Sequence, residues 1–225
     1  MFFGLTGERF VVPPALGGPA LRLFGFAVFG GPADSVAALE AITGRLVAAW
    51  APADERGRLR AALLAQPAQF GFPWLGPRAI HQATGAGMPY LLTLQAAYAD
   101  GDSGRVARGL ADLDRLRDRL RVLPQQLSLD AVFQEAWLRA AIGDTARARS
   151  ALDAALATLP LQQAYFESLQ GPISVVHAMA LRARLALRQG DHATAVRWAG
   201  PVLELWAEAD PDLMPRLADL RPLVR

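Results

Sequence analysis

Histidines and carboxylates are the residues of this sequence that could act as metal ligands or as general acids and bases. The three histidines are His81, His177 and His192. No HExxH pattern occurs, and no two histidines stand four residues apart, the spacing that places two ligands on one helix face. The sequence therefore predicts no metal site and no cofactor, and each histidine is expected to be an isolated surface or core residue.

Nucleophilic catalysis finds no support in the residue types present. Cysteine and lysine are both absent, which excludes thiolate nucleophiles, Schiff bases and phosphate loops of the GKS or GKT type. Ser35, Ser128 and Ser168 lack a GxSxG context. Glu135 would have a raised pKa if it were buried with Trp137, but a solvated helix position is the simpler expectation. We therefore expect a protein that is not an enzyme.

Arginine and aspartate alternate over residues 105–121, where six arginines accompany three aspartates. Three acid–base pairs in this segment stand three residues apart: Asp112–Arg115, Asp114–Arg117 and Asp118–Arg121. Residues at this spacing are neighbours on a helix surface, and each pair stabilises a helix by roughly 0.2–0.5 kcal/mol. The pattern predicts a helix with a solvated, charged face.

A second group of arginines has few acids beside it in the sequence. Its members are Arg182, Arg184, Arg188 and Arg197, with only Asp191 nearby. Such a group could bind an acidic partner. Nucleic acid is the weaker expectation, because the formal net charge is only +2 and no aromatic–basic motif of a known nucleic-acid module accompanies the arginines.

The elements that must position these residues are predicted to be helices. Residues 1–33 are rich in Gly, Pro and Phe, and Leu21–Phe29 fits a short helix or a buried strand equally well. The sequence then predicts a helix from an N-cap at Asp34 to Pro52, a helix over Asp54–Gln66, and a packed connector over residues 67–88.

A Gly-Asp pair recurs three times, each time between two apolar stretches: Gly101-Asp102, Gly143-Asp144 and Gly190-Asp191. Glycine can adopt the left-handed conformation that ends a helix. Aspartate can then accept hydrogen bonds from the free N–H groups that begin the next helix. The recurrence therefore predicts a repeat of antiparallel helical hairpins over the last two-thirds of the chain.

These hairpins resemble the tetratricopeptide repeat family over roughly residues 89–208. The second helix of that motif has a turn glycine, a small residue five positions later and another seven positions after that. These two positions hold Ala148 and Ala155 after Gly143, Ala195 and Val202 after Gly190, and, as the poorest match, Val106 and Leu113 after Gly101. Leu152 stands at the motif's large apolar site, and Pro160 stands where a proline often closes the repeat. Small residues there let helices approach closely.

The first helix of each unit departs from the family pattern. Where the motif favours a large aromatic residue, a leucine and a tyrosine, the middle unit has Val132, Glu135 and Arg139, and the third has Met179, Arg182 and Ala186. The turn glycines are 42 and 47 residues apart, longer than the family period of about 34. Extra residues are expected around Arg121–Asp130 and Leu161–Pro172, and Pro201 is expected to kink or shorten the last long helix.

The resemblance also implies where a ligand would bind. In that family, contacts come mostly from the inner face of each unit's first helix. Carried over from the three turn glycines, that face holds Gln95, Tyr98, Gln134, Trp137, His177, Arg184 and Arg188. This set fits a segment with an apolar anchor and an acidic group, since arginine can hold a carboxylate with two hydrogen bonds.

The sequence thus predicts an all-α fold with an irregular helical region over residues 1–88 and stacked hairpins, a tetratricopeptide-like solenoid, over residues 89–225. Apolar residues make up 52% of the 225, which argues against disorder. The most apolar segment, Phe10–Gly31, contains three prolines and an arginine, so neither a membrane span nor a signal peptide is predicted, and the cytoplasm is the expected location.

Two functional classes remain. The favoured one is a non-catalytic scaffold whose concave groove binds a protein or peptide partner. The alternative is a regulatory or sensor domain derived from the C-terminal part of a larger bacterial signalling protein, such as a kinase or a transcriptional regulator. A helical enzyme is the least favoured class.

Overall fold

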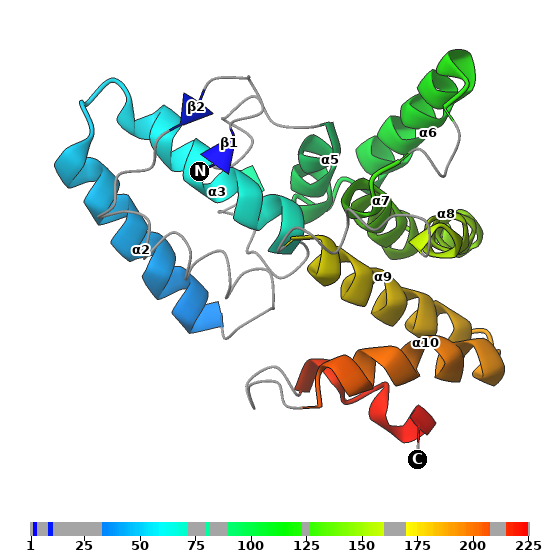
Figure 1. Ribbon diagram of the computed structural model, residues 1–225. Coiled ribbons are helices and arrows are strands. Elements are labelled where there is room, and N and C mark those ends of the chain that lie inside the picture. The colour runs from blue at the N-terminus through cyan, green and yellow to red at the C-terminus, as the bar shows by residue number, and fades with distance from the viewer. Residues whose placement is uncertain are drawn as a thin grey trace. The chain divides into compact units, whose positions relative to one another are not determined.

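The structure, a computed structural model, is all-α in the residues that it describes (Figure 1). These are residues 2–3, 9–10, 33–71, 80–81, 90–122, 127–159, 170–207 and 215–224. They form eight α-helices, short 3₁₀ turns and one pair of antiparallel two-residue strands. The prediction of an all-α fold is therefore confirmed, while Leu21–Phe29 lies outside the described residues.

The chain divides into two compact units, residues 1–101 and 102–225. The first contains the strands β1 (Phe2–Phe3) and β2 (Arg9–Phe10), and the helices α2 (Ala33–Trp50), α3 (Arg56–Gly71) and α5 (Tyr90–Ala99). Phe2 pairs with Phe10, and Phe3 pairs with Arg9. The helix before the first Gly-Asp pair, α5, therefore belongs to the first unit.

Helices α2 and α3 form a hairpin around a small apolar core. Val47 and Ala51 face Leu59 and Leu63 across the hairpin. α2 begins one residue before Asp34, which therefore lies in the first helical turn rather than at the N-cap. α3 continues through Pro67 to Gly71, so the first residues of the predicted connector are helical.

In the described part of the second unit, five α-helices are followed by a short 3₁₀ helix. They are α6 (Ser103–Leu120), α7 (Leu129–Ala141), α8 (Thr145–Ala157), α9 (Gln170–Leu187), α10 (His192–Leu205) and the 3₁₀ helix η5 (Arg221–Val224). α7 packs against α6 and α8, α9 packs against both α7 and α8, and α10 packs against α9 and η5 (Figure 1). Each helix thus packs mainly on its neighbours in the sequence, as the predicted hairpins require.

The turns have the geometry that the Gly-Asp pairs predict. Gly101, Gly143 and Gly190 have φ angles of 79°, 92° and 75°, all in the left-handed region. The aspartate that follows each glycine caps the next helix, and its side chain accepts a hydrogen bond from the N–H of the residue three positions later. The local prediction of both helix ends is confirmed at all three places.

The small residues of the repeat pattern form the contacts between these helices. Val106, Ala148, Ala155, Ala195 and Val202 are buried, and Leu113 is half-buried. Small side chains at these positions let the helix axes approach within the usual 8–10 Å or so of packed helices. α10 continues for four residues beyond Pro201 to Leu205, so the proline does not end this helix.

A short C-terminal segment packs against the last hairpin. Leu217 and Leu220 are buried against Val176 and Ala183 of α9 and against Val202 of α10. The segment thus contacts both helices of the hairpin, as the next helix of a stack would. We call residues 215–224 the C-terminal cap.

Exchange of a turn glycine is expected to destabilise the second unit through backbone strain alone. A Cβ at Gly143 would meet no atom within 4 Å, but its φ of 92° is poorly tolerated by residues with a side chain. We expect Gly143→Ala to lower the free energy of unfolding by about 1 kcal/mol, measured by chemical denaturation.

The matched control is Gly44→Ala, in the middle of α2. A Cβ there would make ordinary contact with the end of the Arg60 side chain, at 3.5 Å. Because alanine is the better helix former, this variant should gain about 0.5–1 kcal/mol. Equal effects of the two substitutions would contradict a left-handed conformation at Gly143.

Candidate functional site

Glu135 is one of the most deeply buried polar residues of the described chain, so its expected solvated position is wrong. Its side chain is 3% exposed, and so is the side chain of Arg139, one helical turn later on α7. Arg139 Nε lies 2.9 Å and Nη2 lies 2.8 Å from Glu135 Oε1. The second carboxylate oxygen lies 2.6 Å from Nη2 of Arg117 on α6. A buried carboxylate requires such partners, because burial alone strongly disfavours its charged form.

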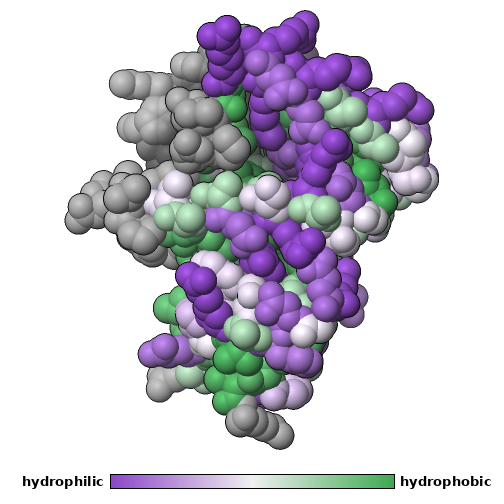
Figure 2. All heavy atoms as spheres, turned by 90° about the vertical axis from the view of Figure 1, so that its right-hand side faces the viewer, coloured by the Kyte–Doolittle hydropathy of each residue, from purple (hydrophilic) through white to green (hydrophobic). Residues whose placement is uncertain are grey.

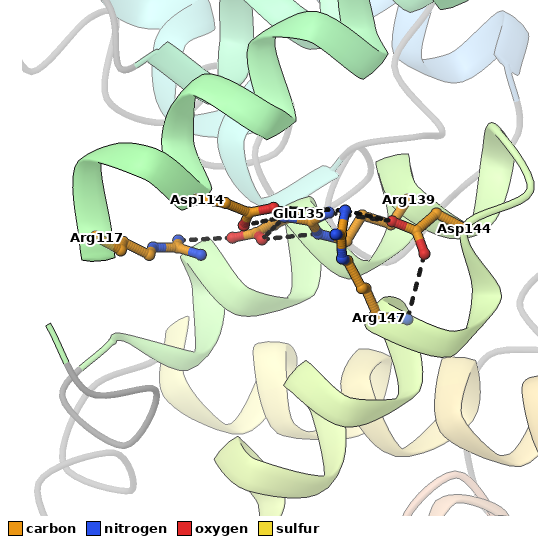
Figure 3. A network of polar contacts seen from close by, with 6 residues as sticks. All are labelled: Asp114, Arg117, Glu135, Arg139, Asp144 and Arg147. Carbon is orange, nitrogen blue, oxygen red and sulfur yellow. Dashed lines mark hydrogen bonds and ion pairs between the residues drawn. The ribbon is translucent and has the colours of Figure 1, made fainter. Parts of the chain in front are cut away.

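Arg139 extends this pair into a network of six charged residues (Figure 3). Its Nη2 lies 2.5 Å from Asp114 Oδ1 of α6, and its Nη1 lies 3.2 Å from Asp144 Oδ2, in the turn between α7 and α8. Arg147 of α8 lies 3.7 Å from both aspartates. Burial alone would lower the pKa of Arg139, but Glu135, Asp114 and Asp144 outweigh this effect and raise it.

The network changes the ion pairs predicted within residues 105–121. Asp112 and Arg115 form the expected exposed pair. Asp114 and Arg117 do not pair with each other; they contact Arg139 and Glu135 of the next helix. The other side of α6 is solvated as predicted: mostly hydrophilic side chains are visible at the top of Figure 2, and Leu116 and Leu120 are exposed beside them.

Three acids and three arginines balance each other in the network, and all six contact at least one member of opposite charge. Since the most buried members, Glu135 and Arg139, are already paired several times over, the network holds helices together rather than binding a ligand. The candidate site must lie elsewhere.

The residues of the predicted groove are divided between the two units. Gln95 and Tyr98 lie on α5 of the first unit, where Gln95 is fully buried and Tyr98 is half-buried. In the second unit, Gln134 and His177 are buried and Trp137 is half-buried. These five side chains are therefore mostly engaged in packing.

His177 has an aromatic neighbour across the contact between α7 and α9. Its ring stacks on Phe133, with the two ring centroids 5.4 Å apart and the planes at 21°. On the same two helices, the Ser174 hydroxyl donates a hydrogen bond to the carboxylate of Asp130. Burial raises the pKa of Asp130. The bond from Ser174 and a backbone hydrogen bond at Asp130 itself lower this pKa, but by less than burial raises it.

The last two predicted residues, Arg184 and Arg188, lie at the end of α9 and directly after it, and Arg184 contacts the C-terminal cap. Arg184 Nε lies 2.7 Å from Asp219 Oδ2, and Arg184 Nη2 lies 3.1 Å from Asp219 Oδ1. The same Nη2 donates a hydrogen bond to the backbone oxygen of Arg216, at 2.6 Å. Arg188 is exposed and directly follows the last residue of α9, Leu187. We call Arg184, Arg188, Arg216 and Asp219 the α9 arginine cluster.

Arg184 influences both of the other charged groups that the C-terminal cap brings to this cluster. Burial and the charge of Arg184 both lower the pKa of Arg216, as expected for like charges that share one region. Burial alone would raise the pKa of Asp219, but the hydrogen bond and charge of Arg184, with a smaller effect of Arg188, lower it. Arg184 therefore holds the Asp219 carboxylate directly, and Arg188 acts on it from nearby, at a partly exposed place.

The other two arginines of the predicted group have different surroundings. Arg182 is buried and forms a two-pronged ion pair with Asp153 of α8, with Nε 2.6 Å from Oδ1 and Nη2 3.1 Å from Oδ2. Arg197 lies over the ring of Trp198, 5.1 Å from its centroid. The four arginines therefore do not form one group: Arg182 joins two helices, Arg197 lies exposed on Trp198, and Arg184 and Arg188 lie near the C-terminal cap.

The sequence prediction missed Arg216 and Asp219. They lie more than 30 residues beyond Arg184, after the stretch assigned to the repeats. The spacing of Leu217 and Leu220 was the only local signal, since two leucines three residues apart can face one core. No pattern in the sequence indicates which arginine Asp219 contacts.

Metal and membrane sites were tested on the same residues. Within the described part of the chain, no group of three histidine, aspartate or glutamate side chains is arranged to hold a metal ion. No helix in the described ranges is long and apolar enough to cross a membrane.

Comparisons with known proteins identify no relative. No family model, curated protein or solved structure matches this chain. The similarity to tetratricopeptide repeats is therefore supported by the turn residues and the order of helix packing alone.

Loss of the buried carboxylate should weaken the second unit strongly. Glu135→Gln leaves Arg117 and Arg139 with too little negative charge in a buried place. We expect a loss of about 3 kcal/mol in the free energy of unfolding. Asp112→Asn removes an exposed ion pair and should change it by less than about 0.5 kcal/mol. Similar losses in the two variants would contradict a central role for Glu135.

Asp130 should make stability fall as the pH rises. The unfolded chain ionises this carboxyl at a lower pH than the folded chain, so stability is lost between the unfolded pKa, about 3.9, and the raised folded pKa. Asp130→Asn should therefore be more stable, relative to the native chain, at pH 7 than at pH 3. The pKa of Asp191 is lowered by the Thr194 N–H, so this aspartate stabilises the fold more at high pH. Asp191→Asn should therefore be less stable, relative to the native chain, at pH 7 than at pH 3.

Proposed function

We propose that this chain is a non-catalytic helical scaffold of the tetratricopeptide type that binds a protein or peptide partner through an acidic group of that partner. The observation that carries the proposal is the α9 arginine cluster, where Arg184 holds the Asp219 carboxylate with two nitrogens and Arg188 lowers the pKa of that carboxylate further. Arg184 and Arg188 are the only members of the expected groove set that combine positive charge with solvent exposure.

The order of helix packing supports the scaffold part of the proposal. α7 and α8 form one hairpin, α9 and α10 form the next, and α9 contacts both helices of the preceding hairpin. This is the nearest-neighbour packing of helical repeat proteins, whose common use is to present a surface to another chain.

The burial of the other groove residues restricts the region where the partner can bind. Gln134 and His177 expose too little surface to bind a ligand, so we place the partner at the end of α9. Arginine suits this task, because its planar guanidinium donates two parallel hydrogen bonds to a carboxylate. Because the cluster is partly exposed, binding should weaken as salt is added.

Peptide display against the immobilised chain tests this proposal. We expect the selected peptides to be enriched in Asp and Glu, and Arg188→Glu to weaken their binding by about tenfold, which corresponds to about 1.4 kcal/mol. Arg188 is the residue to change, because Arg184 also holds the C-terminal cap. Binding by Arg188→Glu should also depend less on salt.

The control is Arg119→Glu, the same charge reversal at an exposed position of α6. It should leave affinity for the selected peptides within about twofold, a difference near the limit of binding measurements. The proposal fails if the selected peptides show no acidic preference, or if both reversals weaken binding equally.

A further inference from the structure

The contact between Arg184 and Asp219 has the geometry that a partner's carboxylate would need. Two nitrogens of one edge of the guanidinium, Nε and Nη2, face the two oxygens of one carboxylate. This is the two-pronged grip expected for an acidic ligand, and here the chain itself supplies the acid.

The position of Asp219 lets its side chain leave without unfolding the cap. The cap is held by Leu217 and Leu220, which are buried on either side of Asp219. The Asp219 side chain is 48% exposed, and Nη2 of Arg184 retains its hydrogen bond to the Arg216 backbone. Rotation of one exposed side chain would therefore free the Nε edge of Arg184.

The pair of Arg182 and Asp153 provides the contrast within the same unit. Its geometry is also two-pronged, but the Arg182 side chain is 8% exposed, against 27% for Arg184. Water and ligands reach Arg184 more easily, so its carboxylate can be exchanged at a smaller cost.

We propose that Asp219 is an internal occupant of a carboxylate-binding site on Arg184, and that an acidic side chain of the partner displaces it. This inference rests on the proposed function, because it concerns how the same cluster accepts its ligand. Arg188 then steers the incoming acid, and the chain's own aspartate keeps the resting affinity low.

The size of the effect follows from the exposure of the pair. An exposed ion pair contributes at most about 1 kcal/mol, so removal of the competing carboxylate should tighten acidic ligands by up to about fivefold. We expect Asp219→Asn to bind the tightest acidic peptide from the display selection two- to fivefold more strongly than the native chain.

The test uses the full chain, with affinity measured by fluorescence anisotropy for that peptide and for its Gln/Asn analogue. Asp219→Ala, which removes both acceptors, should tighten binding as much or more, and the neutral analogue should not respond to either variant. Asp153→Asn is the matched control: it neutralises an equally exposed acid whose partner, Arg182, is buried, and it should leave peptide affinity unchanged.

Two results would overturn the inference. One is unchanged or weaker binding by both Asp219 variants while thermal unfolding shows an intact second unit. The other concerns Glu208, Asp210 and Asp212, the acids that precede the C-terminal cap in the sequence. If neutralising these three tightened peptide binding more than the Asp219 variants do, the competing acid would be among them. A native chain that binds no acidic peptide would instead refute the proposed function, so the two failures are distinguishable.

Discussion

The ion pair between Glu135 and Arg139 is the constraint around which the second unit is built. Both side chains are almost fully buried, and each charge would be costly without partners. Their remaining hydrogen-bonding groups are satisfied by Arg117 and Asp114 of α6 and by Asp144 of the following turn. Three elements must therefore be in register before the pair is stable, so burial of the charges ties their positions together.

This pair stands where the resembled repeat has a leucine and a tyrosine. A large apolar pair holds helices through contact area, which is tolerant of small shifts. A buried charged pair holds helices through directed hydrogen bonds, and small shifts of the helices would weaken these bonds. The same replacement occurs on α9, where Arg182 reaches Asp153 of α8. Arginine serves in every one of these contacts, since its fork can bind two oxygens at once.

Burial separates the structural arginines from the functional candidates. Arg139 and Arg182 are buried between helices and form ion pairs with acidic residues, so these two arginines hold the unit together. Arg184 uses the same fork on a carboxylate near solvent, beside Arg188 and Arg216. One chemical interaction therefore gives rigidity in the interior and an exchangeable contact at the end of the last hairpin. The proposed binding function follows from that difference in exposure.

The features that the sequence determined by itself are local ones, the turns and the helix caps. The left-handed turns at Gly101, Gly143 and Gly190, and the aspartate caps after them, depend on residues within a few positions, so their types were sufficient to predict them. Only the tertiary structure decided which charges are buried and which partners they have. Asp219 is 35 residues from Arg184, and Asp153 is 29 from Arg182. Sequence spacing carries no information at such separations, because the angle and register between packed helices decide which side chains meet.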